Sequence, residues 1–355
     1  MRKYFLGGNT PKGFFSYYDY LIRQTEARKI YVLKGGPGTG KSTLMKKVAL
    51  WAEDEGFDVD YIYCSSDPDS LDGLVIPEMK IAMVDGTSPH IVDPKTPGAV
   101  DTIVHLGHLW NEKNMRKNKD EILCINGMIS EKFTLAYEHL KAAGVLHGTI
   151  SKLRRRMLNK DRVNSVAEEI IYNEIKGISQ KGTGFTRKLF ASAFCPTGYV
   201  SHSRSLSCGK KYLLSGNGAS YITQKVAATL ENYGYDTELF FNPLAPDTEV
   251  LHIYVPELDV GIFTQETVGG ISSEGAYIPD LSGATDKYLL DEYSEELDNC
   301  RQALNAQTEQ ACGVIKRAKA LHDKLECCYI PNMDFAGINK IEQSIIAELE
   351  EMKQS

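Results

Sequence analysis

The apolar positions of the N-terminal segment predict a strand, a tight turn and a helix in direct succession. Lys29–Leu33 is a short apolar run rich in β-forming residues, as expected for a buried parallel strand. Beyond the turn, Leu44, Val48 and Trp51 recur at helical spacing, and Gly56 ends the pattern. This order is that of the first strand, loop and helix of an α/β fold.

Later positions extend the sheet and then change period. Phe57–Cys64 alternates enough for a second core strand, and Lys80–Val84 is a short apolar run that ends at Asp85. From Ala99 to Lys176 the pattern is helical, and the tail from Asp286 mirrors it. Four apolar residues fall near one face of the first helical region: Ile122, Ile125, Ile129 and Phe133. Long paired helices attached to two sheet domains could form a stalk or clamp, but a simple helical cap packed on each domain is the interpretation we favour.

The second half of the chain repeats the first. Short segments recur in the same order, at an offset that drifts as small gaps accumulate. The pairs are Pro11–Ser16 with Pro196–Ser201, Tyr31–Leu33 with Tyr212–Leu214, Lys47–Ala49 with Lys225–Ala227, Gly56–Asp60 with Gly234–Glu238, Ile76–Glu78 with Val255–Glu257, and Leu146–His147 with Leu321–His322. We therefore expect two tandem α/β domains of one ancestry, residues 1–185 and 186–355, forming an internal pseudo-dimer. Each would have a parallel sheet flanked by helices and a long helical region, and Gly182–Gly184 is the expected joint.

The turn after the first strand has the G-x-x-x-x-G-K-[ST] spacing of a phosphate-binding loop. Its glycines let the backbone fold around a phosphate, and Lys41 would reach the β and γ phosphates. Ser42 carries a hydroxyl that would ligate Mg²⁺, and the following helix adds its positive N-terminal end. The residues expected to bind the nucleotide are Gly35, Gly36, Pro37, Gly38, Thr39, Gly40, Lys41, Ser42 and Thr43.

A second nucleotide element follows the third predicted strand. Ile81–Asp85 fits a Walker B strand, whose terminal carboxylate would hold Mg²⁺ directly or through water. Residue 86 is glycine, so the carboxylate that many ATPases place after this aspartate is missing. Asp67 and Asp69 could instead orient a water or an acceptor hydroxyl, although their Asp-Pro-Asp-Ser sequence also favours a plain turn. The catalytic residues expected from these motifs are Lys41, Asp85 and Asp67.

Other charged residues near these motifs have weaker functional signals. Glu78 and His90 flank the strand that ends at Asp85, and we expect a structural role for each. Arg154–Arg156 is a concentrated positive run beside Lys152 and Lys160. It could supply an arginine finger to a γ-phosphate or contact nucleic acid, but a solvated helix face is the simpler interpretation.

The two halves differ at the phosphate-binding elements. In the second half the loop Ser215–Tyr221 is about three residues shorter, and no Lys-Ser pair follows its glycines. The position of Asp85 falls on Thr264. Because the phosphate-binding lysine and the Mg²⁺ carboxylate are missing together, we expect the second half to have kept the fold without hydrolysing Mg-ATP.

Composition and charge narrow the function classes. Among the 355 residues, 42% are hydrophobic and 25% are charged, as in a globular domain that folds in water. The net charge of −7 gives no overall electrostatic case for nucleic acid or an anionic membrane. No stretch approaches the roughly 18 apolar residues of a membrane span. The eight cysteines form no C-x-x-C pair or common zinc pattern, so we expect reduced cysteines in a cytoplasmic protein.

Taken together, the chain resembles a bacterial family of tandem P-loop ATPases over nearly its whole length. The segments that carry the resemblance are Thr10–Phe14, Gly35–Ser42, Ser65–Gly73, Ile76–Glu78 and Val84–His90. The resemblance implies an ATP-binding, ATP-hydrolysing cytoplasmic protein. The second half departs from the P-loop pattern, which weighs against a two-site ATPase cycle.

The leading hypothesis is therefore an ATPase that uses ATP and Mg²⁺ at one competent site, with a non-catalytic second repeat. One alternative is a kinase for a small molecule or nucleotide, with Asp67 or Asp69 as the base for an acceptor hydroxyl. Another is a non-enzymatic, ATP-gated switch whose helical regions bind a protein partner. We expect ATP rather than GTP, because the sequence has no N/T-K-x-D base-reading motif.

Overall fold

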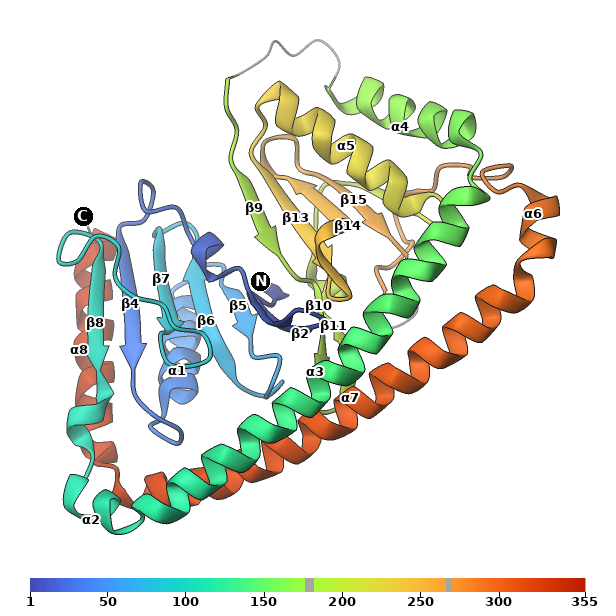
Figure 1. The fold of residues 1–355 in the computed structure, drawn as a ribbon. Helices are drawn as coiled ribbons and strands as arrows, with labels where there is room; N and C mark the ends of the chain where they lie inside the picture. The colour runs from blue at the N-terminus through green and yellow to red at the C-terminus, as the bar shows by residue number, and fades with distance from the viewer. Residues whose placement is uncertain (176–181, 266–269, 355) are drawn as a thin grey trace.

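The computed structural model describes residues 1–175, 182–265 and 270–354, which form two lobes joined by a pair of long helices (Figure 1). The N-lobe is built on a six-stranded sheet of order β1-β5-β6-β7-β4-β8. Its strands span Arg2–Tyr4, Asp60–Tyr63, Leu71–Ile76, Ile81–Asp85, Lys29–Lys34 and Asp101–His105, respectively. The strands expected before Gly35, near residues 57–64 and before Asp85 are confirmed as β4, β5 and β7.

The C-lobe is built on a second six-stranded sheet, of order β9-β13-β14-β15-β12-β16. Its strands span Thr186–Leu189, Thr237–Asn242, Ala245–Val255, Val260–Thr264, Lys210–Leu214 and Ala276–Tyr277, respectively. In both sheets the third strand of this order is antiparallel to its two neighbours, and the remaining neighbours pair in parallel. The two sheets therefore share one connectivity.

Two details of the sequence prediction were wrong. The sheets are mixed rather than parallel, because short loops after β5 and β6 join consecutive strands, whereas parallel neighbours need a long crossover. The region expected to be helical from Ala99 begins instead with β8, which pairs in parallel with β4 at the sheet edge. The other end of that expected helical region, Lys176, lies outside the described residues.

The helices that cover the sheets cross between the lobes. In the N-lobe, α1 (Lys41–Asp54) shares an apolar cluster with Ile345 and Leu349 of the C-terminal helix α8 (Phe335–Gln354). In the C-lobe, α5 (Ala219–Tyr233) packs against α4 (Lys160–Ile175), which precedes the second sheet in the chain. The expected division at residue 185 thus separates the strands of the two sheets, while α4 and α8 each cover the sheet of the other half.

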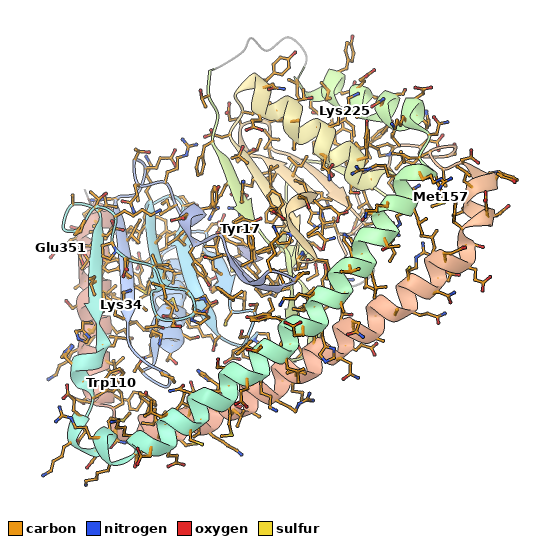
Figure 2. The ribbon with its side chains drawn as sticks, viewed as in Figure 1. Tyr17, Lys34, Trp110, Met157, Lys225 and Glu351 are labelled. Carbon is orange, nitrogen blue, oxygen red and sulfur yellow. The ribbon has the colours of Figure 1, made fainter. Side chains whose placement is uncertain are left out.

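The long helices α3 (Lys119–Arg156) and α7 (Ser294–Tyr329) run side by side in opposite directions beneath both lobes (Figure 1). Ile125, with Ile122 and Ile129 beside it, packs against Leu325 and Cys328, so this part of the predicted apolar face of α3 meets α7. Short helices α2 (Glu112–Lys117) and α6 (Lys287–Glu292) lead into the pair. Trp110 and Met157 mark its two ends (Figure 2). The pair bridges the lobes instead of forming a separate cap on each.

The lobes meet at the edge strands β1 and β9. Arg2 lies 2.5 Å from Asp60 and 2.6 Å from Glu238, and Arg187 lies 2.8 Å from Glu238. Burial alone would raise the pKa of Glu238, but Arg2 and Arg187 together lower it. Backbone hydrogen bonds between Phe5 and Phe190 continue the contact. The carboxylate of Glu238 at this contact is thus paired with guanidinium groups from both lobes.

Two β-hairpins lie between the lobes, one from each half. The first consists of β2 (Gly7–Thr10) and β3 (Gly13–Ser16), and the second of β10 (Ser192–Cys195) and β11 (Gly198–Ser201). Tyr17, labelled in Figure 2, follows the first hairpin. Its ring packs on Phe190, with the two ring centroids 4.7 Å apart. Within the described ranges, no helix combines the length and apolar character of a bilayer-spanning segment.

Candidate functional site

The glycine-rich turn of the N-lobe forms a loop, residues 35–40, between β4 and α1. Gly38 and Gly40 have φ values of +63° and +80°, a left-handed conformation that glycine adopts without strain. Thr39 Oγ1 donates to Gly36 O at 2.9 Å and holds the loop closed. Gly40 is the N-cap of α1 and offers no side-chain cap to it. The backbone N–H groups of the first helical turn and the positive end of the helix dipole therefore border this loop.

Lys41 and Asp85 meet beside the loop. Lys41 Nζ lies 3.5 Å from Asp85 Oδ2, and it donates to the carbonyls of Gly35 and Gly36 at 2.7 and 2.8 Å. Only 11% of the lysine side chain and 13% of the aspartate side chain are exposed. They come together because β4 and β7 are parallel neighbours in which Leu33 is paired with Asp85. Both strands thus end at the same sheet edge, where ligands bind in α/β folds.

The remaining loop residues predicted from the sequence lie at the same end of the sheet. Ser42 Oγ accepts a hydrogen bond from the Leu71 N–H at 3.0 Å, so its hydroxyl faces the start of β6. Pro37 is half-buried in the loop, and Thr43 is exposed in the first turn of α1. The structure therefore gathers a lysine, a hydroxyl and a carboxylate around one glycine-rich loop.

Asp67 and Asp69 occupy the turn between β5 and β6. Ser70 donates to the Asp67 carboxylate at 2.9 Å, and its N–H donates to the Asp67 carbonyl, so the turn expected from Asp-Pro-Asp-Ser is present. Asp67 also lies 3.4 Å from Lys319 Nζ of α7. Asp69 is exposed, and its carbonyl accepts from Lys46. Among the contacts of the described residues, only Asp67 of the two is tied to an element from the other half of the chain.

Two of the other charged candidates, Glu78 and the run Arg154–Arg156, lie away from the glycine-rich loop. Glu78 is exposed in the turn before β7, at the strand end opposite Asp85. Arg154–Arg156 ends α3 at the C-lobe, where Arg154 O accepts from Asn217. The hypothesis that this run supplies an arginine finger to the loop of residues 35–40 is therefore wrong. His90 is buried in the N-lobe, 3.3 Å from Asp72.

Helix α7 and Ile330, the residue after it, contribute contacts that the sequence interpretation missed. Glu326 Oε1 accepts the Gly38 N–H at 3.2 Å, and His322 lies 3.9 Å from the same oxygen. A Cβ on Gly38 would stand 2.7 Å from Ile330, and one on Gly36 would stand 3.2 Å from Tyr329. The spacing of Lys319, His322 and Glu326 places all three on one helix face. That spacing is readable in the sequence, but nothing in it shows which loop the face covers.

The corresponding loop of the C-lobe, residues 215–218, has no counterpart of Lys41 or Asp85 among the residues that the structure describes. Leu214 is paired with Thr264 as Leu33 is with Asp85, so the expected exchange of Asp85 for Thr264 is confirmed by register. Helix α5 begins at Ala219, as α1 begins at Lys41. Four residues separate Leu214 from Ala219, whereas seven separate Leu33 from Lys41. A Cβ on Gly218 would stand 2.6 Å from Val163, so an apolar side chain covers this loop.

Comparison of the chain with protein-family models, curated proteins and solved structures finds no match. The geometry of the two loops is therefore the basis for any assignment. Each loop joins an interior strand, β4 or β12, to a helix, and in both lobes the partner strand ends at the matching position. Among the residues that the structure describes, only those at the first loop bring a cation, a hydroxyl and a carboxylate together.

Proposed function

We propose that the chain binds Mg-ATP at the loop of residues 35–40 and hydrolyses it there, and that the loop of residues 215–218 is not a second site. The observation that carries this proposal is the 3.5 Å approach of Lys41 to Asp85 beside a glycine-rich loop and a helix N-terminus. This combination of groups suits a polyphosphate and its metal ion.

Each group has a role in this proposal. The loop N–H groups and Lys41 would hold the β and γ phosphates. Ser42 and Asp85 would hold Mg²⁺, which, when bound, neutralises charge on the phosphate oxygens. Asp67 is the candidate for orienting the attacking water, because Lys319 and Ser70 fix its carboxylate in a turn next to β6, whose Leu71 contacts Ser42.

The proposed site is composite. Glu326, Tyr329 and Ile330 all contact or border the loop, although they belong to the second half of the chain. We infer that the two lobes descend from one repeated unit whose terminal helices are exchanged. The shared strand order and the matching pairs Leu33–Asp85 and Leu214–Thr264 support this inference. The C-lobe would then serve the N-lobe site through α7 instead of through a loop of its own.

The direct test is steady-state ATP turnover by the full chain with Mg²⁺. We expect Lys41→Ala to abolish turnover, because the phosphates lose the cation that the site is built around. Lys152→Ala, an exposed lysine of α3, is the matched control and should leave turnover unchanged. Equal turnover in Lys41→Ala and wild type would refute the assignment. Release of inorganic phosphate with ADP separates hydrolysis from transfer to an acceptor, which a kinase would show.

A second candidate function, an ATP-gated switch, is favoured by one observation. Glu326 of α7 holds the N–H of Gly38, and a phosphate chain on the loop would compete for that N–H. Nucleotide binding would thereby act on the α3–α7 pair that joins the lobes. If turnover is negligible but ATP changes the rate of proteolysis within α7, and Glu326→Gln removes the change, the switch is the better account.

A further inference from the structure

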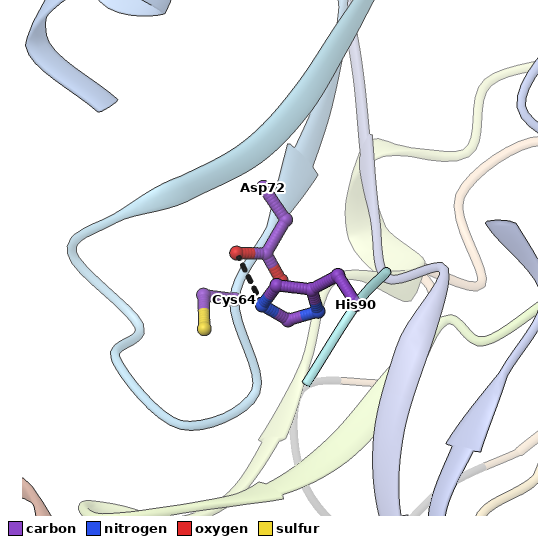
Figure 3. Close-up of side chains that lie close together, drawn as sticks. All are labelled: Cys64, Asp72 and His90. Atoms are coloured by element: carbon purple, nitrogen blue, oxygen red, sulfur yellow. Dashed lines mark ion pairs between the residues drawn. The ribbon is translucent and has the colours of Figure 1, made fainter. Parts of the chain in front are cut away.

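A second cluster of chemically active side chains lies in the N-lobe, at the sheet edge next to Asp85. Cys64 follows β5, Asp72 lies in β6 and His90 follows β7. Their ligand atoms all lie within 4.8 Å of one another, and His90 Nε2 is 3.3 Å from Asp72 Oδ1 (Figure 3). The exposed fractions of Cys64, Asp72 and His90 are 8%, 3% and 8%. Three separate segments thus converge on one buried point.

The local structure explains how Asp72 reaches this point. The β5–β6 pairing runs from Ile62 opposite Gly73 to Tyr63 opposite Leu71, and it skips Asp72. Such a bulge re-aims the side chain of the extra residue. The Tyr18 hydroxyl then donates to Asp72 Oδ2 at 2.8 Å and fixes the carboxylate.

The imidazole of His90 is held by aromatic packing. Tyr18 and Phe14 approach it with ring centroids 5.1 and 5.2 Å away. Both rings come from the segment around the first hairpin, which lies over this part of the sheet. The side chains around the cluster therefore hold two of its three members in place.

Burying the charged forms of these groups costs folding free energy unless the groups become neutral or bind a cation. Burial raises the pKa of the Cys64 thiol, and the neighbouring Asp72 raises it further. Burial also raises the pKa of Asp72, although His90 opposes this effect. A buried carboxylate and thiol therefore favour their protonated forms, whereas a divalent cation among them would favour both anions.

We propose that Cys64 Sγ, the Asp72 carboxylate and His90 Nε2 bind one divalent transition-metal ion of the zinc class. Thiolate, imidazole and carboxylate together suit Zn²⁺, whereas Mg²⁺ takes oxygen ligands. On binding, the Cys64 thiol and the protonated Asp72 carboxyl give their protons to solvent and become a thiolate and a carboxylate ligand, so affinity rises with pH. Three protein ligands leave one tetrahedral position for water or another ligand.

This site is distinct from the proposed Mg²⁺ site and does not depend on the proposed function. Gly73 is paired with Val84 in the antiparallel β6–β7 pair, so Asp72 lies opposite Asp85 and the two sites would be direct neighbours that share no ligand. Within the described ranges, His90 Nδ1 has no hydrogen-bond partner. Metal-bound histidines usually donate from the second ring nitrogen, so we expect affinity about 10–100-fold below that of a fully supported zinc site.

The test is metal binding by the full chain after removal of metals with a chelator. Zn²⁺ is titrated in competition with a chromophoric chelator, and Co²⁺ is titrated while the thiolate-to-metal absorption band is followed. We expect one equivalent of Zn²⁺ per chain and a thiolate band with Co²⁺. Cys64→Ser and His90→Gln should each weaken Zn²⁺ binding more than about 100-fold, since loss of a ligand exceeds loss of a supporting contact.

Two controls separate this site from alternatives. Cys312→Ser changes a buried cysteine of α7. His322→Gln changes a second group of possible ligands among the described residues, His322 with Asp323 and Glu326. Both should retain tight binding, and so should Lys41→Ala. If wild type shows no competition with the chelator, or Co²⁺ binds without a thiolate band, the proposal is overturned even when the cluster variants fail to fold. Loss of binding in His322→Gln but not in Cys64→Ser would overturn it as well.

Discussion

Replacing Glu326 by glutamine is expected to tighten Mg-ATP binding. Glu326 Oε1 accepts the Gly38 N–H at 3.2 Å, and loop N–H groups are the donors that would cradle phosphate oxygens. A carboxylate and a phosphate therefore compete for one donor. Glutamine keeps the size and the carbonyl oxygen of the side chain but removes its negative charge.

The expected gain in binding free energy follows from two contributions, the hydrogen bond to Gly38 and the charge repulsion with phosphate. A hydrogen bond to a charged group contributes about 1.5–3 kcal/mol and a neutral one about 0.5–1.5, so the carboxylate holds Gly38 more strongly by about 1 kcal/mol. Repulsion between unit charges about 4 Å apart near a surface reaches about 4 kcal/mol. The Glu326 side chain, 32% exposed, can relieve most of it by turning toward solvent. A net gain of about 1–2 kcal/mol corresponds to roughly 5–30-fold tighter binding.

The assay is titration calorimetry with Mg-ATP at low and at high salt. The gain should shrink at high salt, because screening weakens the repulsion that the variant removes. Asp323→Asn is the control, since it removes the same charge one turn earlier on α7, where Asp323 pairs with Lys319. Unchanged or weaker binding in Glu326→Gln would show that the carboxylate does not compete with phosphate at Gly38.

Other expected outcomes test the metal ion, the lobe interface and the pH dependence. Asp85→Asn should reduce the ratio of ATP affinities measured with Mg²⁺ and with EDTA to near one, because the carboxylate that favours the metal is lost. Arg187→Met should lower the free energy of unfolding, measured by urea denaturation, by about 3–5 kcal/mol, because Asp60 and Glu238 stay buried without this partner. The control Arg116→Met, at an exposed ion pair, should change it by less than about 1 kcal/mol. Burial and Lys3 lower the pKa of His202 to about 4, so below pH 6.5 the unfolded chain takes up the proton first. Stability should therefore fall by about 2 kcal/mol between pH 6.5 and 4, and His202→Gln should flatten that part of the profile; an equal slope in both proteins would refute this assignment.

The sequence predicted the parts of the fold that depend on local pattern. The strand, loop and helix around residues 29–54 follow from apolar spacing and glycine, and Asp286 caps a helix where the tail was expected to turn helical. The position of Thr264 also followed from aligning the two halves, and strand register confirms it. These features involve residues that are close in the chain or aligned by repetition.

What could not be predicted depends on contacts across long separations. Nothing in the pattern of α8 shows that it covers the first sheet instead of the second, because either apolar surface would accept it. The same exchange brings Glu326 to Gly38 across 288 positions of sequence. The β6 bulge that turns Asp72 toward Cys64 and His90 likewise leaves no local signal, since all three residues lie on separate elements.

The central claim is that one nucleotide binds per chain and that Lys41 holds it. The most direct measurement is the stoichiometry and affinity of Mg-ATP binding to wild type, Lys41→Ala and Asn217→Ala, the last in the C-lobe loop. We predict one nucleotide per chain in wild type and in Asn217→Ala, and none detectable in Lys41→Ala. Two nucleotides per chain, or undiminished binding in Lys41→Ala, would contradict the account.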